Sequence, residues 1–120
     1  MGRRYLTTEE AISAIKRGKE VEIFLGGFVK AGDKCIRWAS FGFDGDKYIG
    51  KVWEAIDEGS ENFLDIYSFS PASGEWDSPA KQAESREFEA VLKELDCSSG
   101  KIVNYGLVQD EYAEYLSTST

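Results

Sequence analysis

The sequence contains no histidine, and this absence excludes several kinds of chemistry. Histidine is the commonest general base at neutral pH and the commonest metal ligand. Catalytic sets that place a histidine beside a serine or cysteine nucleophile are therefore excluded within this chain. Two cysteines and carboxylates are a poor ligand set for zinc, so we expect no metal site and no bound cofactor.

Cysteines and long apolar runs are also scarce. Cys35 and Cys97 lie far apart in the sequence, which favours two reduced, buried thiols over a disulfide or a reactive thiol. No apolar run approaches the roughly 20 residues that span a bilayer. No apolar segment follows Arg3 and Arg4, so a secretory signal is not predicted. We expect a cytoplasmic protein that does not associate with membranes.

The residues that are present predict a folded, acidic protein. The chain has 120 residues, of which 42% are hydrophobic, and its sixteen aromatic residues are too many for a disordered acidic chain. This length predicts a single domain over residues 1–120. The net charge of -8 is uneven, because residues 1–51 carry +3 and residues 52–120 carry -11. The acidic half is either a solvated face or a footprint for a basic partner.

Helix and strand signals begin near the N-terminus. Thr7 and Glu10 have the spacing of a capping box, and an apolar stripe follows, which predicts a helix over residues 8–17. Residues 20–25 alternate between two sides, with Glu20, Glu22 and Phe24 on one of them, which predicts a half-buried strand.

A hairpin follows. The dipeptide Asp44-Gly45 is typical of a two-residue type I′ turn between strands over residues 35–43 and 46–57. This turn would place Phe43 opposite Asp46. Both faces of the hairpin then carry large apolar groups, which indicates a sheet partly covered on both sides or an exposed aromatic patch.

The second half predicts further elements over residues 63–69 (strand), 79–96 (helix), 102–108 (short strand), 110–116 (short helix) and 117–120 (frayed tail). The predicted fold class is α+β, in the order α-β-β-β-β-α followed by a short strand or helix. Short connections favour a single antiparallel sheet of four to five strands with two main helices packed on it. We expect one shared core between them.

These observations favour a non-enzymatic protein-interaction module. Usual catalytic sets are absent, and tryptophan and tyrosine are residues that often anchor interfaces. The candidate contact residues are Trp38, Tyr48, Trp76, Tyr112 and Tyr115. A core position is the alternative for Trp38 and Tyr48, and covering the core edge is the alternative for Trp76. The expected partner is another protein with a basic surface, nucleic acid is disfavoured by the net charge, and a homodimer is compatible with the sequence.

Two alternatives stay open. The exposed carboxylates of the predicted acidic helix, with Glu84, Glu87 and Glu94 as candidate contacts, could imitate DNA phosphates toward a basic nucleic-acid-binding protein. In element order and charge the chain resembles some small phage inhibitors of CRISPR effectors, although no specific motif carries this resemblance. The other alternative is an enzyme that uses carboxylates or Cys97 in a pocket.

Overall fold

The computed structural model describes residues 5–60, 63–72, 79–97 and 101–118. Its elements, in chain order, are β1 (Tyr5–Leu6), α1 (Thr8–Lys16), β2 (Val21–Lys30), β3 (Asp33–Asp44), β4 (Lys47–Ile56), the 3-10 helix η1 (Ile66–Ser68), β5 (Lys81–Ser85), α2 (Phe88–Glu94), β6 (Ile102–Asn104) and α3 (Val108–Thr118). The strands form one antiparallel sheet in the order β1-β6-β2-β3-β4-β5. The α+β class and the antiparallel sheet are confirmed. The expected four to five strands and two main helices are corrected to six strands and three α-helices among the described residues.

Helix α1 begins where its capping box predicts. The Glu10 amide donates to the Thr7 hydroxyl at 3.1 Å, and the Thr7 amide donates to the Glu10 carboxylate at 2.9 Å. These two bonds satisfy backbone donors that the first helical turn leaves without partners. The helix then buries Ala11, Ala14 and Ile15 against the sheet.

The central hairpin forms with a register that differs from the predicted one. Asp44 pairs with Lys47 and Phe43 pairs with Tyr48, so Gly45 and Asp46 form the turn. Gly45 has a φ of +69°, the sign that a type II′ turn requires at its first central position. The partner of each β3 residue therefore moves by two positions along β4. Because side chains alternate with period two, every side chain keeps its predicted face.

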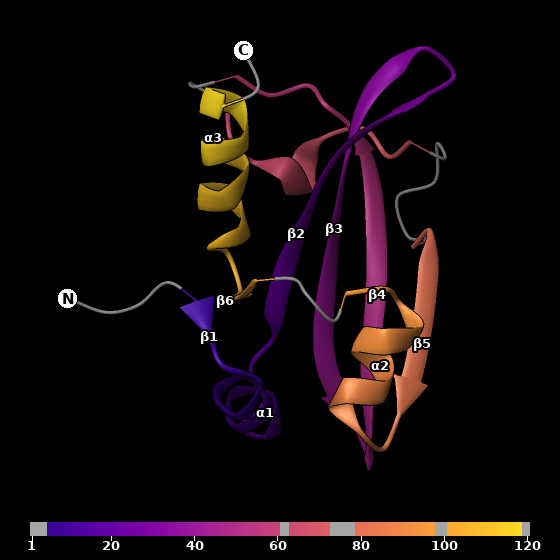
Figure 1. Ribbon diagram of the computed structural model, residues 1–120, viewed down its shortest axis with the longest axis vertical. Coiled ribbons are helices and arrows are strands. Elements are labelled where there is room, and N and C mark those ends of the chain that lie inside the picture. Colours follow the sequence, from indigo (N-terminus) through magenta and orange to yellow (C-terminus); the bar gives the residue numbers. More distant parts are fainter. Residues whose placement is uncertain (1–4, 61–62, 73–78, 98–100, 119–120) are drawn as a thin grey trace, which may run out of the picture.

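The sheet carries two cores, one on each face, and not the single shared core expected. On one face α1 and α2 pack against β-strand residues that include Phe41 and Val52. On the other face α3 and η1 pack against alternate residues of the same strands, including Ile36 and Trp38. Figure 1 shows α1 and α2 toward one end of the sheet and α3 toward the other. The strands between them therefore bury side chains in both directions.

Two predicted elements are wrong in type. Lys81–Ser85, expected as the first part of a helix, is strand β5, because the residues lack an apolar helical stripe and pair with the free edge of β4. The stripe itself begins at Phe88, where α2 begins. The expected strand over 63–69 contains η1, which turns Ile66 and Phe69 toward the second core.

The C-terminal part also differs from the expected boundaries. The strand expected over 102–108 is limited to β6, and α3 extends through Thr118, into the segment expected to fray. Residues 119–120 lie outside the described part of the chain.

Strand β2 contains a bulge. Phe24 pairs with Trp38 and Gly26 pairs with Arg37, so Leu25 is one extra residue in the ladder. Beyond it, the Phe28 ring lies below the Arg37 guanidinium, 4.3 Å from its carbon to the ring centroid. Gly27 faces α3, where the hydroxyl of Tyr115 occupies the space that a Cβ atom would need.

Candidate functional site

A small cavity with acidic and aromatic walls opens on the sheet face that carries the second core. It has a volume of about 250 Å³. We call it the acidic aromatic pocket, and its lining residues are Glu20, Glu22, Trp38, Ser40, Trp53, Tyr67 and Tyr105. They come from β2 and the residue before it, from β3 and β4, from η1, and from the turn after β6.

Strand register brings the pocket residues to one face. Glu22 pairs with Ser40 across β2 and β3, and Trp38 pairs with Trp53 across β3 and β4. Residues two apart on a strand point to the same face, so Trp38 and Ser40 lie beside each other on β3. The Trp53 indole N–H donates to the Ser40 hydroxyl at 3.0 Å and fixes the orientation of the indole ring.

Glu22 forms the floor of the pocket and is the one charged or polar side chain buried among the described residues. Its exposure is 1%. The Tyr67 hydroxyl donates to Glu22 Oε1 at 2.6 Å, and the Gly106 amide donates to the same oxygen at 3.0 Å. The second oxygen, Oε2, has no hydrogen-bond donor within the described part of the chain. A buried carboxylate oxygen without a donor is costly, so such an atom is a feature to be explained.

Burial raises the pKa of Glu22 above 4.5. The hydrogen bonds from Tyr67 and Gly106 act in the opposite direction because they favour the carboxylate, and the nearby negative charge of Glu20 raises the pKa further. Burial and the bond to Glu22 also raise the pKa of Tyr67, so its hydroxyl stays protonated and remains a donor. A positive charge beside Oε2 would relieve the cost of the buried carboxylate.

The aromatic walls meet at defined angles. The Trp38 and Tyr67 rings lie edge to face, with centroids 6.2 Å apart and planes at 80°. Tyr105 stacks on Tyr67 with centroids 5.6 Å apart and planes at 14°. Aromatic faces carry negative electrostatic potential and attract cations. Lys51 already uses this property, because its ammonium lies 6.0 Å from the Trp53 ring centroid.

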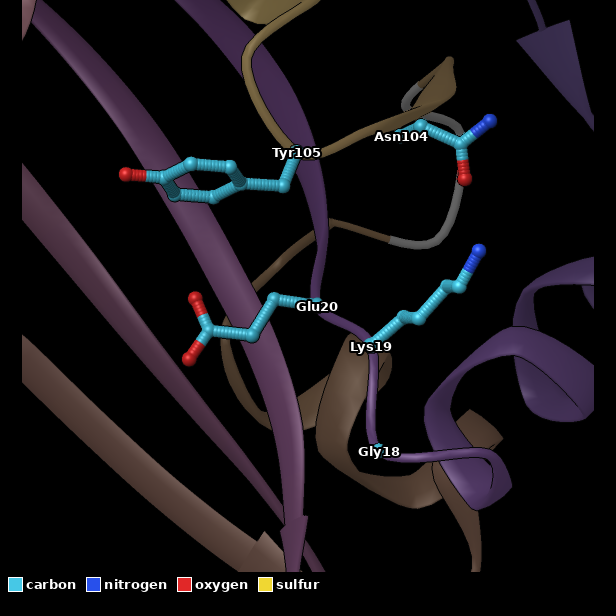
Figure 2. A pocket seen from close by; sticks show the side chains of 5 residues that line it. All are labelled: Gly18, Lys19, Glu20, Asn104 and Tyr105. Atoms are coloured by element: carbon cyan, nitrogen blue, oxygen red, sulfur yellow. The ribbon is translucent and has the colours of Figure 1, made fainter.

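The mouth of the pocket adjoins a second hollow. This hollow measures about 670 Å³ and is lined by Gly18, Lys19, Glu20, Asn104 and Tyr105. Figure 2 shows the Glu20 carboxylate and the Tyr105 ring projecting to one side, and Lys19 and Asn104 pointing away from them. Glu20 and Tyr105 line both spaces, so they form the rim between the acidic aromatic pocket and solvent.

The predicted aromatic contact residues are mostly interior. Trp38, Tyr48 and Tyr112 are buried, at 7%, 5% and 0% exposure. Tyr48 packs in the first core, and Tyr112 packs in the second, where its hydroxyl donates to Asp57. Tyr115 is half-buried against the second core. Trp38 alone among the described four lines the pocket, and Trp76 lies outside the described residues.

The predicted acidic residues are exposed but are not on one helix. Glu84 belongs to β5, Glu87 precedes α2, and Glu94 ends α2. The Lys47 ammonium lies 3.5 Å from the Glu84 carboxylate, which partly neutralises this surface. Nothing in the geometry joins these three carboxylates to the acidic aromatic pocket.

Six pocket residues were not predicted as site residues, namely Glu20, Glu22, Ser40, Trp53, Tyr67 and Tyr105. The alternating pattern placed Glu22 on the polar side of its strand, which implied that its side chain is exposed to solvent. One feature of the sequence did indicate that Glu22 is buried. Both faces of the hairpin carry large apolar groups, and a sheet that is covered on both faces also buries the residues on its polar side.

Cys35 and Cys97 are both buried, and neither forms a disulfide. Burial raises the pKa of Cys97 to about 11, with a smaller contribution from Asp96, so its thiol is protonated at neutral pH.

Over the described ranges, no helix is long and apolar enough to cross a membrane. No three potential metal ligands converge there either.

Comparisons with protein-family models, curated proteins and solved structures found no match for this chain.

Proposed function

We propose that this protein is a non-enzymatic interaction module that binds a positively charged side chain of a partner protein in the acidic aromatic pocket. The observation that supports this most directly is Glu22, a carboxylate at 1% exposure that lines an aromatic cavity and whose Oε2 atom has no donor among the residues that the structure describes. A cation inserted there gains an opposite charge and aromatic faces in one place.

The charge of the whole chain supports the same class of partner. The net charge of -8 attracts cations and speeds their encounter with the surface. Glu20 stands exposed at the rim, so an approaching cation meets one carboxylate before it reaches the buried one. The pocket is smaller than the roughly 300–1,000 Å³ typical of drug-sized ligands, which suits the end of one side chain.

The test uses three blocked tripeptides that carry arginine, lysine or norleucine between two glycines. Norleucine keeps the aliphatic stem of lysine and removes the charge. We expect titration calorimetry to show binding of the two cationic peptides and none of the norleucine peptide. Glu22→Gln keeps the side-chain shape and should weaken binding at least tenfold, because it removes the buried negative charge.

Glu84→Gln is the matched control, since it removes an exposed carboxylate outside the pocket. Its affinity should equal that of the unmodified protein. Equal binding of the norleucine peptide, unchanged binding by the Glu22 variant, or no binding of either cationic peptide contradicts the proposed function. Circular dichroism of each variant checks that the fold is retained.

An acidic mimic of nucleic acid is a second candidate, supported by the exposure of Glu84, Glu87 and Glu94. Such a surface would bind a basic groove of a nucleic-acid-binding protein. Reversing all three charges should then abolish capture of the partner from host extract and leave thermal stability nearly unchanged. Capture that survives the triple charge reversal contradicts this candidate.

A carboxylate-dependent enzyme is a third candidate, supported by the raised pKa of buried Glu22, because a carboxyl that holds its proton more tightly is suited to act as a general acid. An enzyme would turn over some member of a panel of nitrophenyl glycosides and esters, and Glu22→Gln would abolish that turnover. Absence of turnover across the panel, together with cation binding, favours the interaction module.

A further inference from the structure

We propose that the acidic aromatic pocket selects a trimethylated lysine side chain of a partner protein over an unmethylated one. This inference rests on the proposed function and names the ligand more narrowly. It follows from the number of hydrogen-bond acceptors in the pocket, the proportion of aromatic walls and the size of the cavity.

The interior offers few acceptors for an ammonium group. An unmodified lysine ammonium has three N–H donors, and an arginine guanidinium has five. Glu22 Oε1 already accepts from Tyr67 and Gly106, and the Ser40 hydroxyl already accepts from Trp53. This leaves Glu22 Oε2 as the interior carboxylate oxygen with no donor in the described part of the chain.

A bare ammonium would therefore exchange water for too few protein acceptors. Burying a polar donor without a hydrogen-bond partner lowers the affinity of a ligand. Lysine is also a compact and strongly hydrated charge, so removing its water is expensive. A trimethylammonium group keeps the positive charge and has no N–H donors at all, so it enters the pocket without this cost.

The walls match the same group. Four of the seven lining residues are aromatic, and the Trp38 and Tyr67 rings lie edge to face with their planes at 80°. Aromatic faces surrounding a quaternary ammonium recognise it through charge and methyl contacts together. The two carboxylates, one at the floor and one at the rim, supply the negative charge that balances the ligand.

The experiment compares one blocked peptide in three forms, with lysine, trimethyllysine or a neutral residue that replaces the trimethylammonium by a tert-butyl group. Choline chloride is a fourth ligand. Titration calorimetry at constant salt measures the dissociation constants, and tryptophan fluorescence reports on Trp38 and Trp53. We expect trimethyllysine to bind at least tenfold more tightly than lysine, and also more tightly than the tert-butyl peptide and choline.

Trp53→Leu tests the contribution of the aromatic wall. This substitution should reduce the preference for trimethyllysine over lysine at least threefold, because it removes a ring and keeps both carboxylates. Val29→Ala, at an exposed position outside the pocket, is the control and should keep the full preference. If Trp53→Leu fails to fold, Trp53→Phe should retain the preference with a reduced affinity.

The outcomes separate this inference from the proposed function. Lysine binding as tightly as trimethyllysine overturns the inference and leaves the proposed function standing. The tert-butyl peptide binding as tightly as trimethyllysine shows that charge is not recognised and overturns both. If choline binds as tightly as the trimethyllysine peptide, the peptide contributes nothing to recognition. This result overturns the inference that the ligand is a lysine side chain of a partner protein. Failure of every ligand to bind overturns both.

Discussion

Replacing Tyr67 by phenylalanine removes one hydroxyl and keeps the ring, so it isolates the hydrogen bond to Glu22. That bond measures 2.6 Å and ends on a carboxylate at 1% exposure. A hydrogen bond to a charged group contributes about 1.5–3 kcal/mol, and a bond between neutral groups about 0.5–1.5 kcal/mol. We expect Tyr67→Phe to lower the free energy of unfolding by about 2 kcal/mol where Glu22 is ionised and by about 1 kcal/mol where it is protonated, so the loss should be larger at pH 8 than at pH 5.

The sign of this pH dependence follows from the pKa of Glu22. The folded pKa lies above the unfolded value of 4.5, so the folded protein holds this proton more tightly than the unfolded chain. The contribution of Glu22 to stability therefore falls as pH rises through the folded pKa. The Tyr67 bond lowers that pKa, and removing the bond raises it further. The variant must then lose more stability at high pH than at low pH.

Urea unfolding followed by tryptophan fluorescence at both pH values measures the effect. In a Glu22→Gln background the loss caused by Tyr67→Phe should be the same at pH 5 and pH 8, because nothing titrates at position 22. Tyr48→Phe is the control, since Tyr48 is a buried tyrosine whose hydroxyl has no hydrogen-bond partner among the described residues. An equal loss at both pH values in the unmodified background, or a pH-dependent loss that persists with Glu22→Gln, refutes the reasoning.

Three further predictions concern packing, reactivity and charge. Gly50→Ala places a methyl group 2.6 Å from the nearest α2 side chain and should cost about 1–3 kcal/mol in urea unfolding, whereas Gly42→Ala, with its nearest neighbour at 3.7 Å, should not destabilise. Similar stabilities for the two variants would contradict the placement of α2. Cys97, with a pKa of about 11, should react with a thiol reagent at pH 7 far more slowly than it does in urea, and equal rates would contradict its burial. Lys51→Met removes the ammonium 6.0 Å from the Trp53 ring and should raise the affinity for the trimethyllysine peptide by about two- to fivefold, so an unchanged affinity would show that Lys51 does not compete.

The elements that could be predicted from sequence are those fixed by neighbours in the chain. The α1 capping box involves two residues three positions apart, and both of its hydrogen bonds form. The central hairpin depends on a short turn, and its two faces are as predicted although the register is not. An error of two positions was possible because Asp44 and Gly45 are both turn residues, while Gly45 alone takes a positive φ in this turn.

The elements that could not be predicted are fixed by distant partners. Lys81–Ser85 has neither clear alternation nor a helical stripe, and its strand conformation comes from pairing with β4, about thirty residues earlier. The conformation of the segment around Ile66 is determined by its packing in the second core, to which α3 also contributes. Local sequence patterns carry little information about such pairings, because tertiary contacts override propensity.

The pocket illustrates the same limit. Glu22 lies on a strand whose alternation was predicted correctly, but its burial depends on Tyr67 and the turn at Gly106, which contact it from far along the chain. The sequence places Trp38 and Trp53, the two tryptophans of the pocket, on neighbouring strands of the predicted hairpin. Their pairing with each other required the exact register of the hairpin.

The bulge in β2 has a consequence for insertions and deletions. Leu25 is one residue more than its partner strand requires, and it reverses the alternation for the rest of β2. Gly27 therefore lies under α3, and Phe28 lies on the opposite face against Arg37. Deleting Leu25 would restore a regular ladder with the same cross-strand partners, so Gly27 would stay under α3 and Phe28 would stay against Arg37. A one-residue deletion at the bulge would thus leave α3 in place, and an insertion at the β2–β3 turn would likewise leave both faces unchanged.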